Sequence, residues 1–226
     1  MIKIGIIDSG INKGYRDGEL EIQGVFLKRD EVTNEICAFE NIVDQIGHGT
    51  ECFKIISSIS IGVSYYVVKV FDQEMVADIG VLAQAIQTCI DQNVDVINIS
   101  AGVVSDKIPE LLRLACDEAY DNNVIVIAAK HNSGSHCYPA HYIKVMSVGA
   151  ADLVEGELYK YTSNGNIEFY TSARDLYPEH IVWSHSTSFA CAKMTAYVAN
   201  LLKLKGKIKM EQLKNELIHQ NQIINK

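Results

Sequence analysis

The chain has 226 residues, 48% of them hydrophobic, with a formal net charge of -8 and a pI near 5.3. This length supports one sizeable core, so we expect a single domain over residues 1–226. The acidic balance argues against a nucleic-acid partner, because proteins that bind the phosphate backbone usually carry a basic face. No apolar run approaches the roughly 18 residues of a membrane helix, so no membrane partner is expected either.

Two features favour a cytoplasmic protein. Met1 leads directly into a strand-sized apolar segment, which lacks the longer apolar region and the cleavage site of a secretory signal. None of the cysteines stands in a C-x-x-C spacing, and several lie in apolar segments, where a free thiol behaves as a small hydrophobe. We therefore expect reduced thiols at positions 37, 52, 89, 116, 137 and 191.

Short β-branched apolar runs recur along the chain and have the length of strands buried on both faces. Helical periodicity is clearest between them, at 77–92 and 107–122, and another amphipathic helix begins near Thr50. Strands that alternate with helices imply right-handed crossovers and a mainly parallel sheet flanked by helices, which is an α/β fold. The predicted strands are 2–7, 65–71, 94–100, 124–129 and 143–150.

After residue 150 the pattern changes to shorter polar strands, with a turn signal at 163–166. A helix is predicted from about 187 to 204 and a last amphipathic one from about 209 to 219, followed by a frayed tail. Functional residues of parallel sheets gather at the carboxyl ends of the strands. The loops that follow the predicted strands are therefore where a site is expected.

Four residues with reactive or polar side chains stand in such places. Asp8 ends the first strand in IIDSG, His48 lies between two glycines in DQIGHGT, and Asn132 follows a buried strand in VIVIAAKHNSG; Ser188 opens a helix in HSTSFACAK. Each alone has a structural explanation, since an Asp at a strand end also suits metal or phosphate binding, Asn forms turns and Ser caps helices. Their joint occurrence is informative, because Asp, His and Ser in this order mark subtilisin-type triads.

The chain resembles the subtilases, which are subtilisin-like serine proteases. The resemblance implies a three-layer subtilisin-like fold. The N-terminal pro-domain of the family is either removed or never present, and because Met1 directly precedes the first predicted strand we expect a minimal intracellular form that folds without one. The matching segments run through nearly the whole chain in family order: IGIIDSGI, DQIGHGT, VVKVFD, DVINISAG, VIVIAAKHNSG, YPAHYIKVMSVGA and STSFACA.

The same resemblance implies a role for each site residue. Ser188 would be the nucleophile, His48 the general base and then acid, and Asp8 the group that fixes the histidine tautomer. The side-chain amide of Asn132 and the backbone N–H of Ser188 would form the oxyanion hole. Ser186 and its neighbour Thr187 would shape the turn and cap the helix.

An extended peptide segment is the substrate that the resemblance implies. It would lie as an added strand against Ser100, Ala101 and Gly102, so that main-chain hydrogen bonds carry much of the recognition. The Tyr138–Pro139 bond is expected to be cis, as it often is in the family.

The chain departs from the family pattern beside two of the catalytic motifs. STSFACA replaces GTSMAxP, which puts Ser186 where a glycine is usual. HGTECFK replaces HGTHVAG, which puts Glu51 and Lys54 where a histidine and a glycine are usual. Neither change removes a catalytic group.

The pocket for the residue that precedes the scissile bond is expected to involve Ala129, His131 and Cys137. His131 replaces a glycine that usually lines this pocket, and Cys137 is placed near its floor, so we expect a narrow pocket. His136 and His141 lie nearby in sequence and are zinc-ligand types, but their spacing fits no standard site. No metal and no other cofactor are therefore expected.

Two functions follow. The first is a serine endopeptidase of narrow specificity, such as one that removes a leader from a precursor peptide. The alternative is a catalytically silent, subtilase-like protein that binds peptides or acts as a scaffold beside an unknown partner subunit. The four intact site residues favour the first, whereas the altered pocket and motif flanks keep the second open. A nucleotide-binding protein is not favoured, because no P-loop or dinucleotide-binding glycine motif is present.

Overall fold

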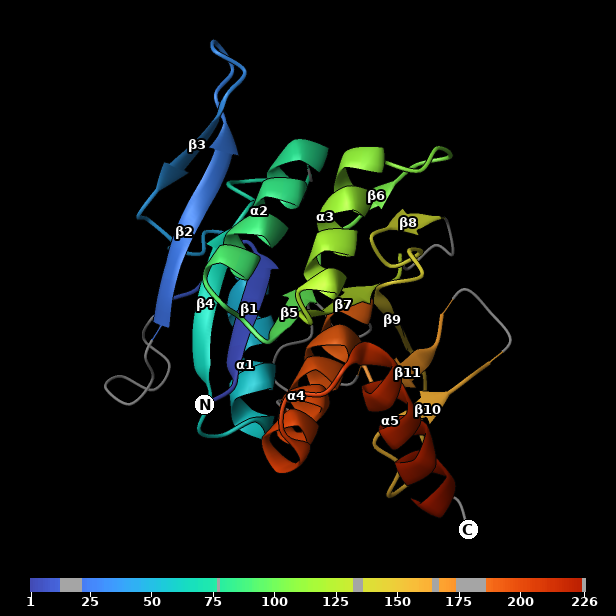
Figure 1. Ribbon diagram of the computed structural model, residues 1–226. Helices are drawn as coiled ribbons and strands as arrows, with labels where there is room; N and C mark the ends of the chain where they lie inside the picture. Colours follow the sequence, from blue (N-terminus) through green and yellow to red (C-terminus); the bar gives the residue numbers. More distant parts are fainter. Residues whose placement is uncertain (13–21, 77, 132–135, 164–166, 174–185, 225–226) are drawn as a thin grey trace.

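The computed structural model describes residues 1–12, 22–76, 78–131, 136–163, 167–173 and 186–224. Over these residues the chain forms three layers, with a mainly parallel sheet between two layers of helices (Figure 1). The predicted α/β fold is therefore confirmed. None of the described helices combines the length and apolarity that crossing a bilayer requires.

The sheet is built around the apolar runs of the sequence, and all five predicted strands are present with shifts of a few residues at their ends. Within the described residues its strands are β1 (Lys3–Asp8), β2 (Ile22–Arg29), β3 (Ile36–Phe39), β4 (Ser64–Lys69), β5 (Val96–Ile99), β7 (Ile125–Ala129), β9 (Met146–Ala150), β10 (Lys160–Tyr161) and β11 (Phe169–Thr171). Their order is β10-β11-β9-β7-β5-β1-β4-β2-β3. Only the outermost pairs, β10 with β11 and β2 with β3, are antiparallel.

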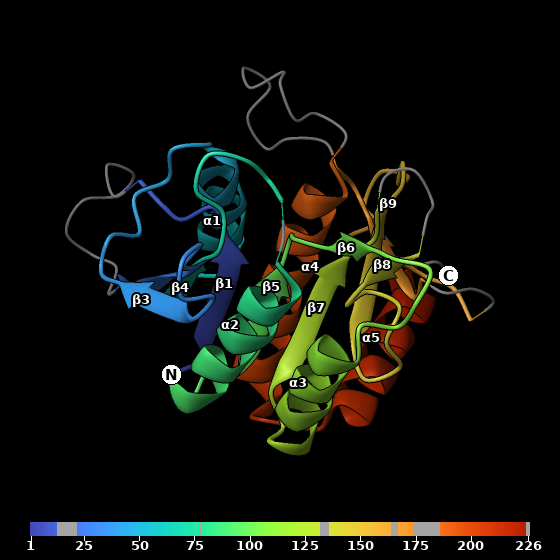
Figure 2. The ribbon, with the colours of Figure 1, turned by 90° about the horizontal axis from the view of Figure 1, so that it is seen from above.

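Helices cover both faces of this sheet (Figures 1 and 2). Helices α2 (Ile79–Asp91) and α3 (Glu110–Asp121) pack on one face of the sheet, against strand side chains such as Ile7 and Ile97. Helices α1 (His48–Ile59), α4 (Thr187–Lys205) and α5 (Met210–Ile224) pack on the other face. The residues after 219 were expected to fray, but α5 continues through them to Ile224, so that expectation is wrong.

A second, two-stranded sheet lies beyond the carboxyl ends of the central strands. It pairs β6 (Val103–Val104) with β8 (Cys137–Tyr138) in antiparallel register. Neither strand was predicted, because two residues carry no periodicity. The pairing joins the chain after β5 to the chain before the Tyr138–Pro139 bond, which is cis as expected.

The carboxyl ends of β1, β5 and β7 meet at one edge, because these strands pair in parallel with Ile7 opposite Ile99 and Ile99 opposite Ala128. Helix α4 begins at the same edge, where the hydroxyl of Thr187 donates to the carbonyl oxygen of Lys130 at 2.7 Å. This bond ties the start of α4 to the end of β7. The topology therefore brings segments that are far apart in the sequence to one place.

Candidate active site

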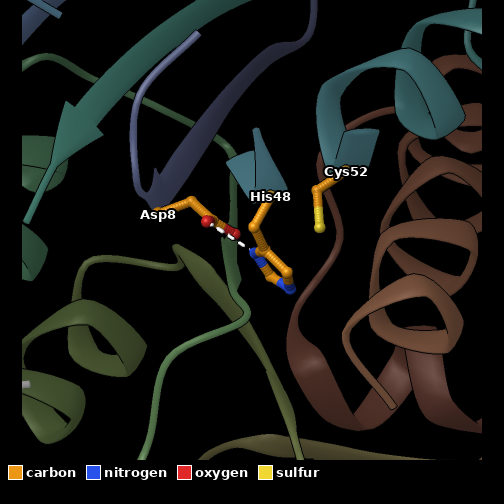
Figure 3. A group of neighbouring side chains, drawn as sticks. All are labelled: Asp8, His48 and Cys52. Atoms are coloured by element: carbon orange, nitrogen blue, oxygen red, sulfur yellow. Dashed lines mark hydrogen bonds and ion pairs between the residues drawn. The ribbon is translucent and has the colours of Figure 1, made fainter. Parts of the chain in front are cut away.

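A buried carboxylate–imidazole pair occupies this edge. Asp8 is the last residue of β1 and His48 is the first residue of α1. Oδ1 of Asp8 lies 2.7 Å from Nδ1 of His48 (Figure 3), and the two residues are only 0% and 2% exposed. The backbone N–H of Ser9 donates to the same Oδ1 at 2.7 Å. The carboxylate is thus held in position and determines the orientation of the imidazole ring.

The two glycines around His48 allow this close approach. Gly47 has a φ of +90°, in the left-handed region that side chains disfavour. A Cβ on Gly49 would lie 2.3 Å from the carbonyl oxygen of Gly10, so a larger residue would push α1 away from the end of β1. The backbone N–H of Gly49 also donates to the hydroxyl of Ser9 at 2.9 Å. The two glycines of the GHG sequence therefore allow α1 to approach the end of β1 closely.

Asp44 organises the loop before α1 and adds a second negative charge near His48. Its Oδ2 accepts from the backbone N–H and the hydroxyl of Thr50 at 2.8 and 2.7 Å, and its Oδ1 accepts from the N–H of Gly47 at 2.8 Å. Burial acts to raise the pKa of the Asp44 carboxyl, but these hydrogen bonds outweigh burial and hold that pKa below its usual value. Asp44 therefore stays ionised.

The pKa of His48 reflects both carboxylates. Burial favours the neutral imidazole and acts to lower this pKa. The charge of Asp8 and its hydrogen bond act in the opposite direction, as does the charge of Asp44, and the net result is a pKa above the ordinary histidine value. The pair is thus arranged to stabilise an imidazolium that forms during a reaction.

Ser188 lies in the first turn of α4 and is 7% exposed. Its hydroxyl donates to the carbonyl oxygen of Ser100 at 3.4 Å, which is long for a bond of this type. The next residue, Phe189, stacks on the His48 ring with the two centroids 6.2 Å apart. The start of α4 therefore lies beside the Asp8–His48 pair, where Ser188 contacts Ser100 and Phe189 contacts the His48 ring.

Behind Ser100 lies a buried polar network. The side-chain amide of Asn98 donates to the hydroxyl of Ser100 at 2.9 Å, and Oδ1 of Asn98 lies 3.0 Å from the hydroxyl of Thr195. Cys52 contacts the same Ser100 hydroxyl, with its sulfur 3.5 Å away. Helices α1 and α4 thus both reach Ser100, and this network holds in place the segment that follows β5.

Asp8, His48 and Cys52 are residues of types that can bind a metal ion, and they lie close together (Figure 3). In the described part of the chain they are the one group of three or more ligand-type residues close enough to share an ion, with ligand atoms all within 4.8 Å of one another. Burial, followed by repulsion from Asp8, raises the pKa of the Cys52 thiol well above its ordinary value. Oδ1 of Asp8 and Nδ1 of His48 are already joined by the 2.7 Å contact, so this arrangement suits acid–base chemistry better than a metal centre.

The predicted substrate segment runs from the Ser188 contact toward β6. Ser100 and Ala101 are buried, whereas Gly102 is exposed. A Cβ on Gly102 would lie only 2.1 Å from the sulfur of Cys137, so the thiol fills the space directly over this glycine. Burial raises the pKa of the Cys137 thiol to about 11, and the thiol is therefore neutral.

Two further pocket residues are placed at the end of β7. Ala129 is buried in that strand, and His131 is exposed just after it. Asn132, the expected oxyanion donor, lies outside the described residues. The ring of His141 is engaged locally, with its Nδ1 2.8 Å from the carbonyl oxygen and 3.1 Å from the backbone nitrogen of Cys137.

The two motif departures beside the predicted catalytic residues have direct structural explanations. Glu51 and Lys54 pair with each other on α1, with their charged atoms 2.7 Å apart. Ser186 is the N-cap of α4, as expected, and its hydroxyl accepts a hydrogen bond from the backbone N–H of Ser188 at 3.2 Å. Thr187 instead makes the contact to Lys130 described above.

Sequence reasoning did not single out Asp44, Asn98, Cys52 or Thr195. The spacing of Asp44, four residues before His48, was a usable signal, because an Asp there can accept from the N–H groups of the following turn. The other three act through contacts between distant segments, for which one sequence offers no local signal.

The fold and the buried Asp–His pair beside a helix-borne serine define the class of subtilisin-like serine hydrolases. In keeping with this, the family model "Subtilase family" of the S8 peptidases matches residues 1–223, and the chain belongs to that family.

Similar proteins extend this comparison. Minor extracellular protease Epr of Bacillus subtilis is 27% identical over 216 residues, which are 90% of this chain and 32% of Epr, so the chain spans about a third of that protein's length. The epidermin leader peptide processing serine protease EpiP from Staphylococcus aureus matches with a TM-score of 0.75 and 18% identity, over 97% of this chain and 69% of EpiP. The nisin leader peptidase NisP from Lactococcus lactis matches with a TM-score of 0.71 and 21% identity, over 95% of this chain and 81% of NisP. At these identities the two structures establish the fold.

Proposed function

We propose that this chain is an active serine endopeptidase in which Ser188 attacks the scissile carbonyl. His48 takes the Ser188 proton and later gives it to the leaving amine, while Asp8 holds the imidazole and stabilises its charged form. Asn132 and the backbone N–H of Ser188 are the proposed oxyanion donors. The observation that carries the proposal is the buried 2.7 Å contact between Asp8 and His48 beside the start of α4.

The proposed substrate is a peptide segment in extended form. It would add as a strand along residues 100–102, which lead from the Ser188 contact to the exposed Gly102. Backbone hydrogen bonds made there do not depend on side chains. Selectivity must then come from the pocket beside this segment.

The close approach of Cys137 to Gly102 supports narrow specificity. The thiol of Cys137 occupies the space over Gly102 and is only 3% exposed, so it leaves little depth for a large substrate side chain. We propose that the residue before the scissile bond is small. The names of EpiP and NisP say that these proteins act on leader peptides. Removal of a leader peptide by this chain would agree with a narrow specificity, under which most other proteins are not cleaved.

A catalytically silent, peptide-binding role is the second candidate. One observation favours it: the Ser188 hydroxyl points to the carbonyl oxygen of Ser100 at 3.4 Å. This contact is weak, however, and a hydroxyl rotates readily about one bond. Hydrogen bonds of catalytic residues also often tighten only when substrate is present. The first function therefore remains the better supported.

The test is labelling with a fluorophosphonate, followed by intact-mass measurement and peptide mapping. We expect one adduct on Ser188 in the unmodified protein and none in Ser188→Ala or His48→Ala. Circular dichroism of all three proteins controls for folding. A folded protein that acquires no adduct would contradict the proposal and favour the silent, peptide-binding role.

A further inference from the structure

The N-cap of α4 involves the same backbone N–H that the proposed mechanism needs. Ser186 has an extended backbone conformation (φ -74°, ψ 128°), and its hydroxyl accepts from the N–H of Ser188 at 3.2 Å. Caps of this kind are common at helix starts. Here, however, the capped N–H belongs to the proposed nucleophile and is one of the two oxyanion donors. The inference that follows rests on the proposed function.

A backbone N–H has a single hydrogen and cannot serve two acceptors well. While the Ser186 hydroxyl accepts that hydrogen, the N–H is not available to a substrate oxygen. The motif that the chain resembles has a glycine at this position and therefore no competing side chain. We propose that Ser186 is a positioning residue that occupies the oxyanion donor of Ser188 in the free protein, and that the substrate carbonyl oxygen must displace its hydroxyl.

The surrounding contacts indicate which group moves. The hydroxyl of Thr187 donates to the carbonyl oxygen of Lys130, and the N–H of Phe189 donates to the carbonyl oxygen of Ser186 at 3.1 Å. These bonds fix the backbone of the first turn, and with it the direction of the Ser188 N–H. Ser186 itself is only half-buried, so its side chain can rotate toward solvent. Displacement therefore needs one side-chain rotation and no shift of the helix.

The competition should affect the reaction more than substrate binding. Oxyanion donors are placed for the oxygen of the tetrahedral intermediate and bind the ground-state carbonyl less well. Removing the Ser186 hydroxyl should therefore raise kcat more than it lowers KM. The expected gain is about 3- to 10-fold, the range that corresponds to one neutral hydrogen bond.

The experiment compares Ser186→Ala and Ser186→Gly with Ser186→Thr, which keeps the hydroxyl, and with the unmodified protein. The probe is a fluorophosphonate, because the phosphonylated serine places an oxygen at the oxyanion position. We expect labelling of Ser188 to be about 3- to 10-fold faster in the Ala and Gly variants and near the original rate in the Thr variant. A cap with a purely structural role predicts the opposite sign, since its loss loosens the first turn of α4 and slows labelling.

Two measurements separate this inference from the proposed function. The amide proton of Ser188, observed by NMR without any reagent, should shift upfield in the Ala and Gly variants and stay in place in the Thr variant. The pH profile of labelling should keep its midpoint, because the Asp8–His48 pair is untouched. Labelling that is unchanged or slower in the Ala and Gly variants, or an unmoved amide proton, overturns the role of Ser186 alone. No labelling in any variant overturns the proposed function and this inference with it.

Discussion

The two halves of the site differ in how completely they are set before substrate binds. On the acid–base side, Asp8 and His48 are fully buried, bonded at 2.7 Å, and supported by the ionised Asp44. On the substrate side, the Ser188 hydroxyl makes a long contact to a backbone carbonyl oxygen, and its N–H is occupied by Ser186. Buried charges require fixed partners, whereas the neutral hydroxyl of Ser188, the proposed nucleophile, does not. The proposed proton-transfer groups are therefore preorganised, whereas the groups proposed to act on the substrate are held by other contacts in the free protein.

The change expected to break the preorganised half most severely is Asp8→Asn. An amide in place of the carboxylate can fix the wrong histidine tautomer and cannot stabilise the imidazolium. The rate of Ser188 labelling and any peptidase activity should fall by about 10⁴-fold, the size of effect known for a triad aspartate. Rates are compared at equal folded concentration, as judged by circular dichroism. A loss of less than tenfold would show that His48 does not depend on this bond.

On the substrate side, Cys137→Gly should widen the pocket over Gly102. The thiol that fills this space would be gone, so larger side chains before the scissile bond should become acceptable. Profiling with a peptide library should show the ratio of kcat/KM for Phe over Ala rising by roughly 10- to 100-fold, in line with a few methylene-sized volumes. Cys37→Ser is the matched control, because Cys37 is a half-buried thiol on the edge strand β3. This substitution should leave the ratio of kcat/KM for Phe over Ala unchanged. An unchanged ratio in Cys137→Gly would place the pocket elsewhere.

The network that joins the two halves can be weakened with Thr195→Val. The Thr195 hydroxyl lies 3.0 Å from Oδ1 of Asn98, which is 0% exposed, and 2.9 Å from the carbonyl oxygen of Cys191, so the substitution removes a donor that these two buried acceptors share. An unsatisfied buried acceptor should lower the free energy of unfolding by about 1–3 kcal/mol, measured by urea denaturation. Thr88→Val is the control, because its lost hydroxyl makes an exposed hydrogen bond on α2. Its free energy of unfolding should change by no more than about 0.5 kcal/mol. Equal losses in both variants would mean that the network does not stabilise the fold.

Features with a local sequence pattern could be predicted from the sequence, whereas features that depend on contacts between distant segments could not. The strands at 96–99 and 125–129 are wholly buried, so apolar runs, broken only by Asn98, marked them clearly. Strand β2 is only partly buried and mixes polar with apolar residues, and β6 exists only through its pairing with β8. Asp8 and His48 were recognisable because glycine-rich motifs surround them. The contact of Cys137 with Gly102 depends on packing between distant segments, to which no local pattern corresponds.

The smallest expected effect concerns the charge of Asp44 on the acid–base side. In the proposed mechanism His48 must be neutral to accept the Ser188 proton. Labelling should therefore increase with pH through the raised pKa of His48, with a midpoint above 6.5. Asp44→Asn removes one of the charges that raise this pKa and should move the midpoint to lower pH. The pKa of Asp44 is lower in the folded than in the unfolded protein. The stability that ionised Asp44 contributes is therefore complete at any pH above its unfolded-state pKa, and it is lost only as the pH falls through its folded-state pKa. That window lies far below the His48 midpoint, so Asp44 stays charged throughout the measurement.

Asp72→Asn is the matched control for Asp44→Asn, because Asp72 is an exposed partner of Lys28 and is not among the charges that raise the pKa of His48. Its pH profile should coincide with that of the unmodified protein. The profiles are recorded well below the unfolding temperature of each variant, since Asp44→Asn also removes an acceptor from the turn before α1. A midpoint that stays in place in Asp44→Asn would leave Asp8 as the sole carboxylate acting on His48. The acid–base half would then be one buried pair, and Asp44 a purely structural support of the loop.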